Sequence, residues 1–286
     1  MLTLDSYAEK SFELWPGALR FAASGPDAHA AVAAGLDAAR EIADSLMSDA
    51  DLMSRGSFDI LPRGLAARQA LDMARSFGQA LGATAAPPLL VALPGAVCDD
   101  VMRAMRHAGK LSFAVAVLGD ALAFHVAGVV LPSDLVSLPL IMGEFVQALG
   151  PRIGEGGVAL AGAHRHFPTS GVADLVAVQS DNAAQAALAA AALSDACLWP
   201  SAKKSHRSIA DPFVARAYEA RARADATGLM PPEDVWETLS KGVKRASVLR
   251  EKRQFHAAAF GLKGRGRIVG PLGGDRLLRF GVSEWR

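Results

Sequence analysis

The longest apolar run in the chain, "LSFAVAVLGDALAFHVAGVVL" (residues 111–131), constrains the fold more than any other segment. Gly119-Asp120 and His125 interrupt it, so it lacks the unbroken stretch of about 20 apolar residues that a membrane-spanning helix needs. Its β-branched and aromatic residues favour strands over helix. The run therefore predicts two buried strands joined by a turn or bulge at Gly119-Asp120.

The segments on both sides of this hairpin carry a mixture of helix and strand signals. We expect helices over about 27–49 with Asp27 as N-cap, 65–81, 181–193 with Asp181 or Asn182 as N-cap, and from 231. A short apolar segment and a helix should share residues 87–110, and a short helix and a Gly-rich loop should share 131–157. Further strands are expected near 12–26, 158–161, 173–178, 267–269 and 277–280, and polar helix after 200. Helices among mostly adjacent strands predict an α+β layer arrangement.

Charge is distributed unevenly along the 286 residues, although the formal net charge is only +1. Residues 241–286 hold 12 Lys and Arg against 3 Asp and Glu, a net charge of +9, which leaves −8 for the rest of the chain. We therefore divide the chain into a body, residues 1–200, and a basic helical and Gly/Arg-rich extension, residues 201–286, that packs on the body or continues it. Such a basic segment favours an acidic surface, a protein partner or phosphates, unless it is simply solvated.

The N-terminal segment "MLTLDSYAEKSFELW" has acidic residues and lacks the apolar region of a secretion signal. Cys98 and Cys197 lie about a hundred residues apart in apolar surroundings, without the spacing of a metal site. Both observations predict a cytoplasmic protein with buried, free thiols.

Two histidines lie two residues apart in the segment "GGVALAGAHRHFPTSGVADLVAV". Side chains at i and i+2 of an extended chain share a face, so His164 and His166 form a candidate half-site for a metal, with Asp120 or Asp174 as third ligand. Arg165 between them favours anion binding instead, or a polar strand end without a ligand. These alternatives remain open on the residues alone.

Asp120 and the loop at residues 168–171 are two further candidates for ligand binding. Asp120 lies between apolar residues, where burying an unpaired carboxylate is costly. If it is buried, we expect backbone amides, a cation or a ligand hydroxyl as its partner. The alternative is a structural carboxylate of the turn without a ligand. The loop "PTSG" (residues 168–171) offers hydroxyls and backbone amides of the kind that cradle phosphates. The chain contains no GxGxxG, P-loop or GxSxG motif.

Taken in order, four segments resemble the uncharacterised ApbE-like proteins, distant relatives of the FAD:protein FMN transferases. They are "GLDAAREIADSLMSDADLMSRGSFDILP", "ALDMARSFG", "FAVAVLGDALAFHVAG" and "GAHRHFPTSGVADLVAVQSDNAAQAALAAAAL", all within residues 15–198. Gly119 and Asp120 take the last two positions of the family's Gly-Gly-Asp turn, His166 takes its motif histidine, and Asp174 belongs to its Ala-Asp pair. The resemblance implies an ApbE-like (T-fold-like) fold, in which layers of antiparallel sheet pack with helices.

The chain also departs from the family at defined positions. Leu118 replaces the first glycine of the turn motif, and residues 160–162 (Leu-Ala-Gly) replace the Ser-Ser-Gly before the histidine. Ala187 and Ala191 stand where the flavin transferases carry an Asp and a Thr near a magnesium ion. Without a carboxylate there, cleavage of the FAD pyrophosphate loses a ligand for the metal, which argues against Mg²⁺ as a cofactor and against FMN transfer.

The resemblance thus implies a cytoplasmic protein that binds or acts on a pterin, flavin or nucleotide-like ligand, in one-carbon (tetrahydromethanopterin-linked) metabolism or cofactor biosynthesis. Whether it catalyses a reaction is left open. The expected catalytic residues are His166, Asp120 and Asp174; the expected ligand-binding residues are Gly119, Asp120, Arg165, His166, Thr169, Ser170 and Gly171; no metal ligand is assigned.

Two alternatives remain. One is a Mg²⁺-dependent flavin transferase. The other is a non-catalytic interaction protein whose basic C-terminal region binds a protein partner or a second copy of the chain. Nucleic-acid binding is not expected, because Phe255, Phe260 and Phe280 are too sparse to form a stacking platform.

Overall fold

The computed structural model describes residues 6–14, 17–55, 61–82, 89–127, 146, 154–163, 165, 169–199, 227–272 and 284–285. The strands are β1 (Tyr7–Leu14), β2 (Gly17–Ser24), β3 (Phe113–Leu118), β4 (Ala121–Val126), β5 (Glu155–Ala161), β6 (Leu175–Ser180), β7 (Ala257–Leu262), β8 (Arg265–Val269) and β9 (Glu284–Trp285). The helices are α1 (Ala28–Arg55), α2 (Leu65–Ala80), α3 (Leu89–His107), α5 (Ala183–Ala196) and α7 (Pro232–Glu251), with a 3-10 turn η1 (Thr227–Leu229).

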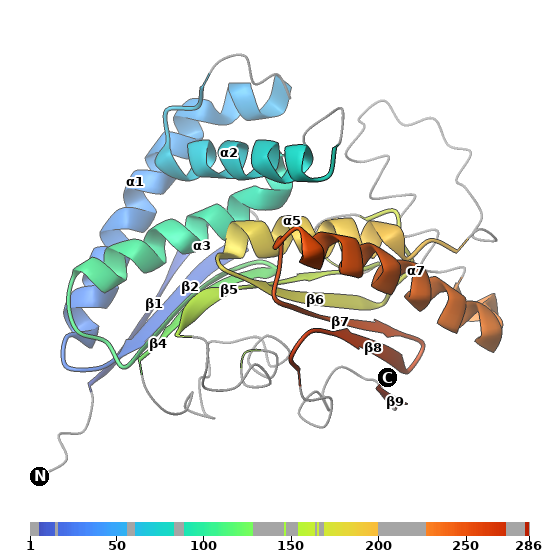
Figure 1. Ribbon diagram of the computed structural model, residues 1–286. Coiled ribbons are helices and arrows are strands. Elements are labelled where there is room, and N and C mark those ends of the chain that lie inside the picture. The colour runs from blue at the N-terminus through green and yellow to red at the C-terminus, as the bar shows by residue number, and fades with distance from the viewer. Residues whose placement is uncertain are drawn as a thin grey trace, which may run out of the picture.

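The described strands form one sheet in which spatial order follows sequence order from β1 to β9. Strands β1 to β8 pair antiparallel with their neighbours, and β9 pairs parallel with β8. The helices lie on one face of the sheet (Figure 1): α1 contacts β1 and β2, α3 contacts β3 and β4, α5 contacts β4 to β6, and α7 contacts β7 and β8. Helix α2 forms an outer layer over α3 and α5. A mixed architecture with an antiparallel sheet and helices is therefore confirmed.

Both faces of the sheet are buried, as the apolar run at 111–131 predicts. Ala114, Ala116 and Leu118 of β3 belong to the core between sheet and helices. Phe113, Val115 and Val117 belong to a second core on the opposite face, which also includes Val146. The predicted turn is present: β3 and β4 pair from Leu118 with Ala121, and Gly119 has a φ of +58°, which glycine adopts without strain.

One local expectation needs correction. The apolar residues after Pro87-Pro88 do not form a separate segment, because α3 runs unbroken from Leu89 to His107 with Pro94 inside it. Proline removes one helical hydrogen bond, but nearly all of the helix from Ala92 to Cys98 is buried, and this burial outweighs the loss. At α1, Asp27 takes the predicted N-cap position: the helix begins at Ala28, and the Asp27 carbonyl accepts from Ala31 N. Its carboxylate accepts from Lys110 N (2.7 Å).

The C-terminal part of the chain continues the sheet. Strand β7 pairs with β6, and β8 pairs with β7, while α7 packs against α5. The expected strand at 267–269 falls within β8. The strand expected at 277–280 and the polar helix expected in 201–226 lie outside the described residues. Of the helix and Gly-rich loop expected in 131–157, Val146 and residues 154–157 are described, and the loop prediction is wrong at 155–157, because these residues begin β5 and pair with β4 and β6. None of the described helices is long and apolar enough to cross a membrane.

The start of α5 packs directly against the backbones of α3 and β5. A Cβ atom on Gly95 of α3 would lie 2.4 Å from the backbone of Ala183, and one on Gly157 of β5 would lie 2.0 Å from it. No real Cβ tolerates such distances, so both glycines are required for this close approach of three backbones. Helix α5 itself is rich in alanine, which keeps the layer thin.

Replacement of Gly157 by alanine should therefore destabilise the protein by about 3 kcal/mol, because the new methyl group meets the backbone of α5 and not a flexible side chain. Urea unfolding measures this free energy. Gly17→Ala is the matched control, since no atom lies within 4 Å of a Cβ at that position. Equal unfolding midpoints for the two variants would contradict the close packing of α5 against Gly157.

Candidate functional site

One end of the sheet carries the residues that the sequence singles out. There, Asp120 in the β3–β4 turn is 6% exposed, and its Oδ1 lies 3.4 Å from the guanidinium of Arg165. The backbone carbonyl of Asp120 also accepts from Leu160 N. The structure thus brings Asp120 and Arg165 together and gives the buried carboxylate the cationic partner that its setting requires. His164 and His166 lie outside the described residues.

The loop at Thr169, Ser170 and Gly171 lies against the C-terminal end of α5. The Thr169 hydroxyl hydrogen-bonds the Ser194 hydroxyl (2.8 Å), and Ser170 N donates to the Asp195 carboxylate. A Cβ on Gly171 would lie 1.7 Å from the carbonyl oxygen of Ser194. Because the last turn of a helix presents carbonyl oxygens and a negative dipole end, these contacts anchor the loop and do not favour a bound anion.

Asp174 is engaged at the turn between β7 and β8. Its Oδ2 accepts from Lys263 N (2.7 Å), and Lys263 has a φ of +48°. The Lys263 ammonium in turn donates to the carbonyl oxygens of Thr227, Gly228 and Met230. Among the described residues no hydrogen bond joins Asp174 to Asp120 or Arg165. Its observed contacts hold a strained turn residue in place.

Ala187 and Ala191 lie one helical turn apart on α5, half-buried. Their methyl groups offer no ligand to a metal. In the part of the chain that the structure describes, no group of three His, Cys, Asp or Glu side chains is placed to hold a metal ion.

A second site, which the sequence did not predict, lies along the polar side of α3 at the opposite end of the sheet. Three cavities of about 320, 430 and 410 Å³ adjoin one another there, and Arg103 lines all of them. We call this set of cavities the α3 groove. The first lies between α3, β4, β5 and the start of α5; the second lies between α1, α3 and the start of α2; the third lies between α2, α3 and the start of α5. Each has the volume of a small-molecule site.

The wall between the first and third cavities is built on Asp99. One oxygen of its carboxylate accepts from Ala183 N (2.8 Å) and the other from Ala184 N (3.0 Å), so it caps the start of α5 from a neighbouring helix. Burial raises the pKa of Asp99 to about 6, against the lowering effect of the two amides and of Arg103. Asn182 completes the cap, since its Oδ1 accepts from Gln185 N (2.8 Å). This confirms Asn182 as the N-cap that the sequence offered beside Asp181.

Two arginines cross the groove, each held by a carboxylate. Arg103 pairs with Asp100 one turn earlier on α3, and the amide oxygen of Gln69, in the orientation that satisfies its neighbours, accepts from the same guanidinium (2.7 Å). Burial raises the pKa of Asp100, although Arg103 opposes this. Arg106 pairs with Glu155 at the start of β5. The two guanidiniums are therefore fixed in position before any ligand arrives.

His125 at the end of β4 faces the same ion pair. Its Nδ1 lies 4.0 Å from the Glu155 carboxylate, and none of the described residues forms a hydrogen bond with it. Burial lowers the pKa of His125, and Arg106 lowers it further, while Glu155 opposes both effects. The imidazole is thus held toward its neutral form beside the groove.

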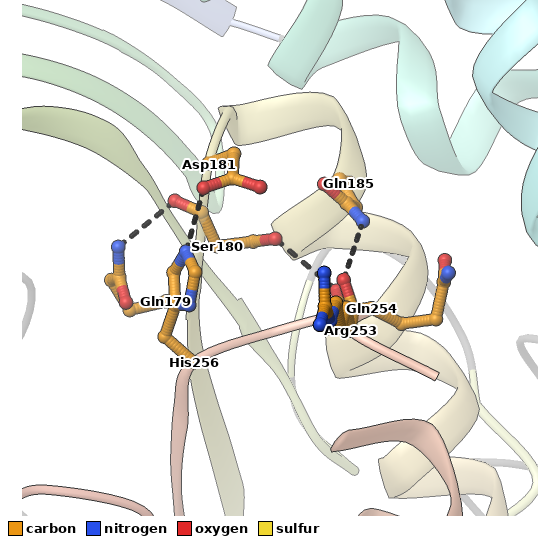
Figure 2. Close-up of polar contacts among 7 residues, drawn as sticks. All are labelled: Gln179, Ser180, Asp181, Gln185, Arg253, Gln254 and His256. Carbon is orange, nitrogen blue, oxygen red and sulfur yellow. Dashed lines mark hydrogen bonds and ion pairs between the residues drawn. The ribbon is translucent and has the colours of Figure 1, made fainter. Parts of the chain in front are cut away.

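A polar network lies next to Asp181 at the edge of the first cavity (Figure 2). Asp181, which lines the first cavity, lies between β6 and α5, and its Oδ1 is 2.7 Å from Nε2 of His256. The Ser180 hydroxyl donates to the Gln254 carbonyl (3.2 Å), and Gln185 of α5 reaches the Arg253 carbonyl (3.5 Å). The contacts tie the start of α5 to the segment between α7 and β7.

The chain matches no protein-family model, and no curated protein is significantly similar to it in sequence. The function is therefore inferred from the residues and the geometry of the two sites.

Replacing Asp99 by alanine should lower the free energy of unfolding by about 2 kcal/mol at pH 5, because two amides at the start of α5 lose their acceptor. Urea unfolding provides the measurement. Asp37→Ala is the control, since that carboxylate is exposed on α1 and pairs only with Arg40 at i+3, a contact that contributes little. If the free energy of unfolding falls by the same amount in both variants, the Asp99 cap does not stabilise α5.

The difference in stability between the native protein and Asp99→Ala should also depend on pH. The pKa of Asp99 is higher in the folded state, about 6, than the ordinary 3.8, so its contribution is largest at low pH and is lost as the pH rises through 6. We expect the difference to shrink by about 1–2 kcal/mol between pH 5 and pH 8. A difference that grows over this interval would mean that the folded protein favours the ionised form.

Proposed function

We propose that the α3 groove binds a cofactor-like ligand of the pterin, flavin or nucleotide type, the classes that the resemblance to ApbE-like proteins implies. On this proposal the chain is a cytoplasmic protein of one-carbon metabolism or cofactor biosynthesis. The observation that carries it is the meeting of three ligand-sized cavities at one fixed side chain, Arg103.

The lining of the groove supports binding of a ring with polar edges. Met102, Ala123 and Phe124 give the first cavity apolar surface, and Met73 and Ala96 do the same in the third. Between these surfaces lie the side chains of Asp99, Arg103 and Asn182. A few fixed polar groups among apolar ones are typical of cofactor sites.

The Asp120–Arg165 pair is a second candidate for the same function. It is supported by one observation: a nearly buried carboxylate and a partly exposed guanidinium meet at the end of the sheet where the sequence places the expected site. The described hydroxyls and amides of the neighbouring loop are occupied by α5, so this site offers a ligand fewer open groups than the α3 groove.

The test is a thermal-shift screen of the full chain with FAD, FMN, folate and tetrahydromethanopterin. A ligand at a hundred times its dissociation constant adds about 2.7 kcal/mol of stability, a rise in Tm of roughly 5–10 °C for a chain of this size. We expect at least one of the four to produce such a shift, and Arg103→Met to reduce it to less than half. The shift should be unaffected by Asp120→Asn.

Arg40→Met is the matched control for Arg103→Met. Arg40 forms an ion pair with Asp37 three residues away on α1, as Arg103 does with Asp100 on α3, but it lies outside the groove. No shift with any ligand would refute the proposal. A shift lost in Asp120→Asn but retained in Arg103→Met would move the site to the Asp120–Arg165 pair.

A further inference from the structure

The wall shared by two cavities of the α3 groove presents three side chains of different chemistry. Asp99, Arg103 and Asn182 line both the first and the third cavity. They supply a carboxylate, a guanidinium and a carboxamide, two from α3 and one from the N-cap of α5. Their donors and acceptors together decide which hydrogen-bonding edge of a ligand fits.

Each of these groups keeps capacity for a ligand. Each Asp99 oxygen accepts one amide N–H and retains a second lone pair. Asn182 uses its Oδ1 for the α5 cap, and none of the hydrogen bonds among the described residues uses its Nδ2 donors. Arg103 has five N–H donors and shares some of them with Asp100 and Gln69. The wall therefore combines acceptors at Asp99 with donors at Asn182 and Arg103.

The formal charge of the two cavities excludes a strongly anionic ligand. Their described lining contains four carboxylates, Asp72, Asp99, Glu155 and Asp181, against two guanidiniums, Arg103 and Arg106. Counted without His107, the formal net charge is −2. Both arginines are already neutralised by carboxylates. A polyphosphate would meet repulsion here, whereas an uncharged ligand rich in N–H donors would not.

We propose that this wall recognises the 2-amino-4-oxopyrimidine edge of a fused heterocycle, with Asp99 accepting from the amino group and the ring N–H, and with Asn182 and Arg103 donating to the carbonyl oxygen. This inference rests on the proposed function and narrows its ligand to the pterin or guanine type. The three side chains together supply acceptors for the amino group and ring N–H of that edge and donors for its carbonyl oxygen. The apolar surface of Met102 and Phe124 provides a contact for the ring.

The other ligand classes present the wrong edge. The pyrimidine edge of a flavin, like that of lumazine, places one N–H between two carbonyl oxygens, so a carbonyl would face the Asp99 carboxylate. A buried acceptor facing another acceptor is left without a hydrogen bond, which is costly for both. The wall therefore distinguishes pterin from lumazine by one exocyclic group, which is an amino group in pterin and a carbonyl oxygen in lumazine.

The ionisation of Asp99 provides an independent consequence. Since burial raises the pKa of its carboxyl to about 6, the acceptor that the ligand needs becomes protonated just below neutral pH. Affinity for the amino-substituted ring should therefore fall as the pH is lowered from 7 to 5.

The experiment is calorimetric titration of the full chain with pterin and with lumazine, which share the ring system and differ at position 2. We expect pterin to bind at least about tenfold more tightly, equivalent to one well-made hydrogen bond to a charged group. Equal binding of the two, or tighter binding of lumazine, would overturn this inference and leave the proposed function standing. Tighter binding of FMN than of pterin would do the same. Guanosine triphosphate presents the same edge, and because of its charge it should bind more weakly than pterin. No binding of any of the four would refute both.

Two variants separate recognition from folding. Asn182→Asp keeps an N-cap oxygen for α5 but replaces the amide donor by a carboxylate, so it should fold and lose at least tenfold in pterin affinity. Asp99→Asn keeps the shape but replaces one of the two acceptors that cap α5 by a donor, so it also lowers stability. In the protein that remains folded, it should remove the preference for pterin over lumazine. Asp37→Asn is the control and should change neither value. Unchanged pterin affinity in a folded Asn182→Asp protein would overturn the assignment.

Discussion

The structure depends on the way α5 begins. Its first residue, Ala183, is in backbone contact with Gly95 of α3 and Gly157 of β5, and its first amides are bonded to Asp99. Three elements thus meet without side chains between them, and a carboxylate from one helix satisfies the orphan donors of another. Because this junction also forms the wall between two cavities, the contact that fixes the helix layer to the sheet also builds the candidate site.

A carboxylate that caps a helix from outside recurs in this protein. Asp49, buried on α1, accepts from Arg63 N and Gly64 N at the start of α2, as Asp99 does for α5. Such a cap places a negative charge at the positive end of the helix dipole, which is favourable, but it also desolvates the charge. At Asp99 desolvation dominates, and the raised pKa shows this balance. Each Asp99 oxygen accepts one amide N–H, so the carboxylate keeps lone pairs for a further donor.

The two ends of α5 have opposite electrostatic character, and this separates the two candidate sites. The N-terminal end meets the acidic residues and fixed arginines of the α3 groove. The C-terminal end meets the loop at Thr169–Gly171 through carbonyl oxygens and Asp195. Hydroxyls and amides that resemble an anion cradle in the sequence are therefore used to attach the loop. A helix C-terminus stabilises such a loop because it offers acceptors and no donors.

Local patterns in the sequence determined the hairpin at Gly119-Asp120, the helices α2 and α5, and Asn182 as N-cap, since turn chemistry, apolar period and capping act within a few residues. They also indicated that Asp120 needs a partner, and Arg165 is near it. Only the tertiary structure decided that Asp99 meets Ala183, 84 residues away, and that Arg103 lines three cavities. The sequence signal for this site was the pair Asp99-Asp100 within a mostly apolar helix. Their role could not be read from spacing, because it depends on which backbones pack against α3, and packing brings together residues that no local pattern relates.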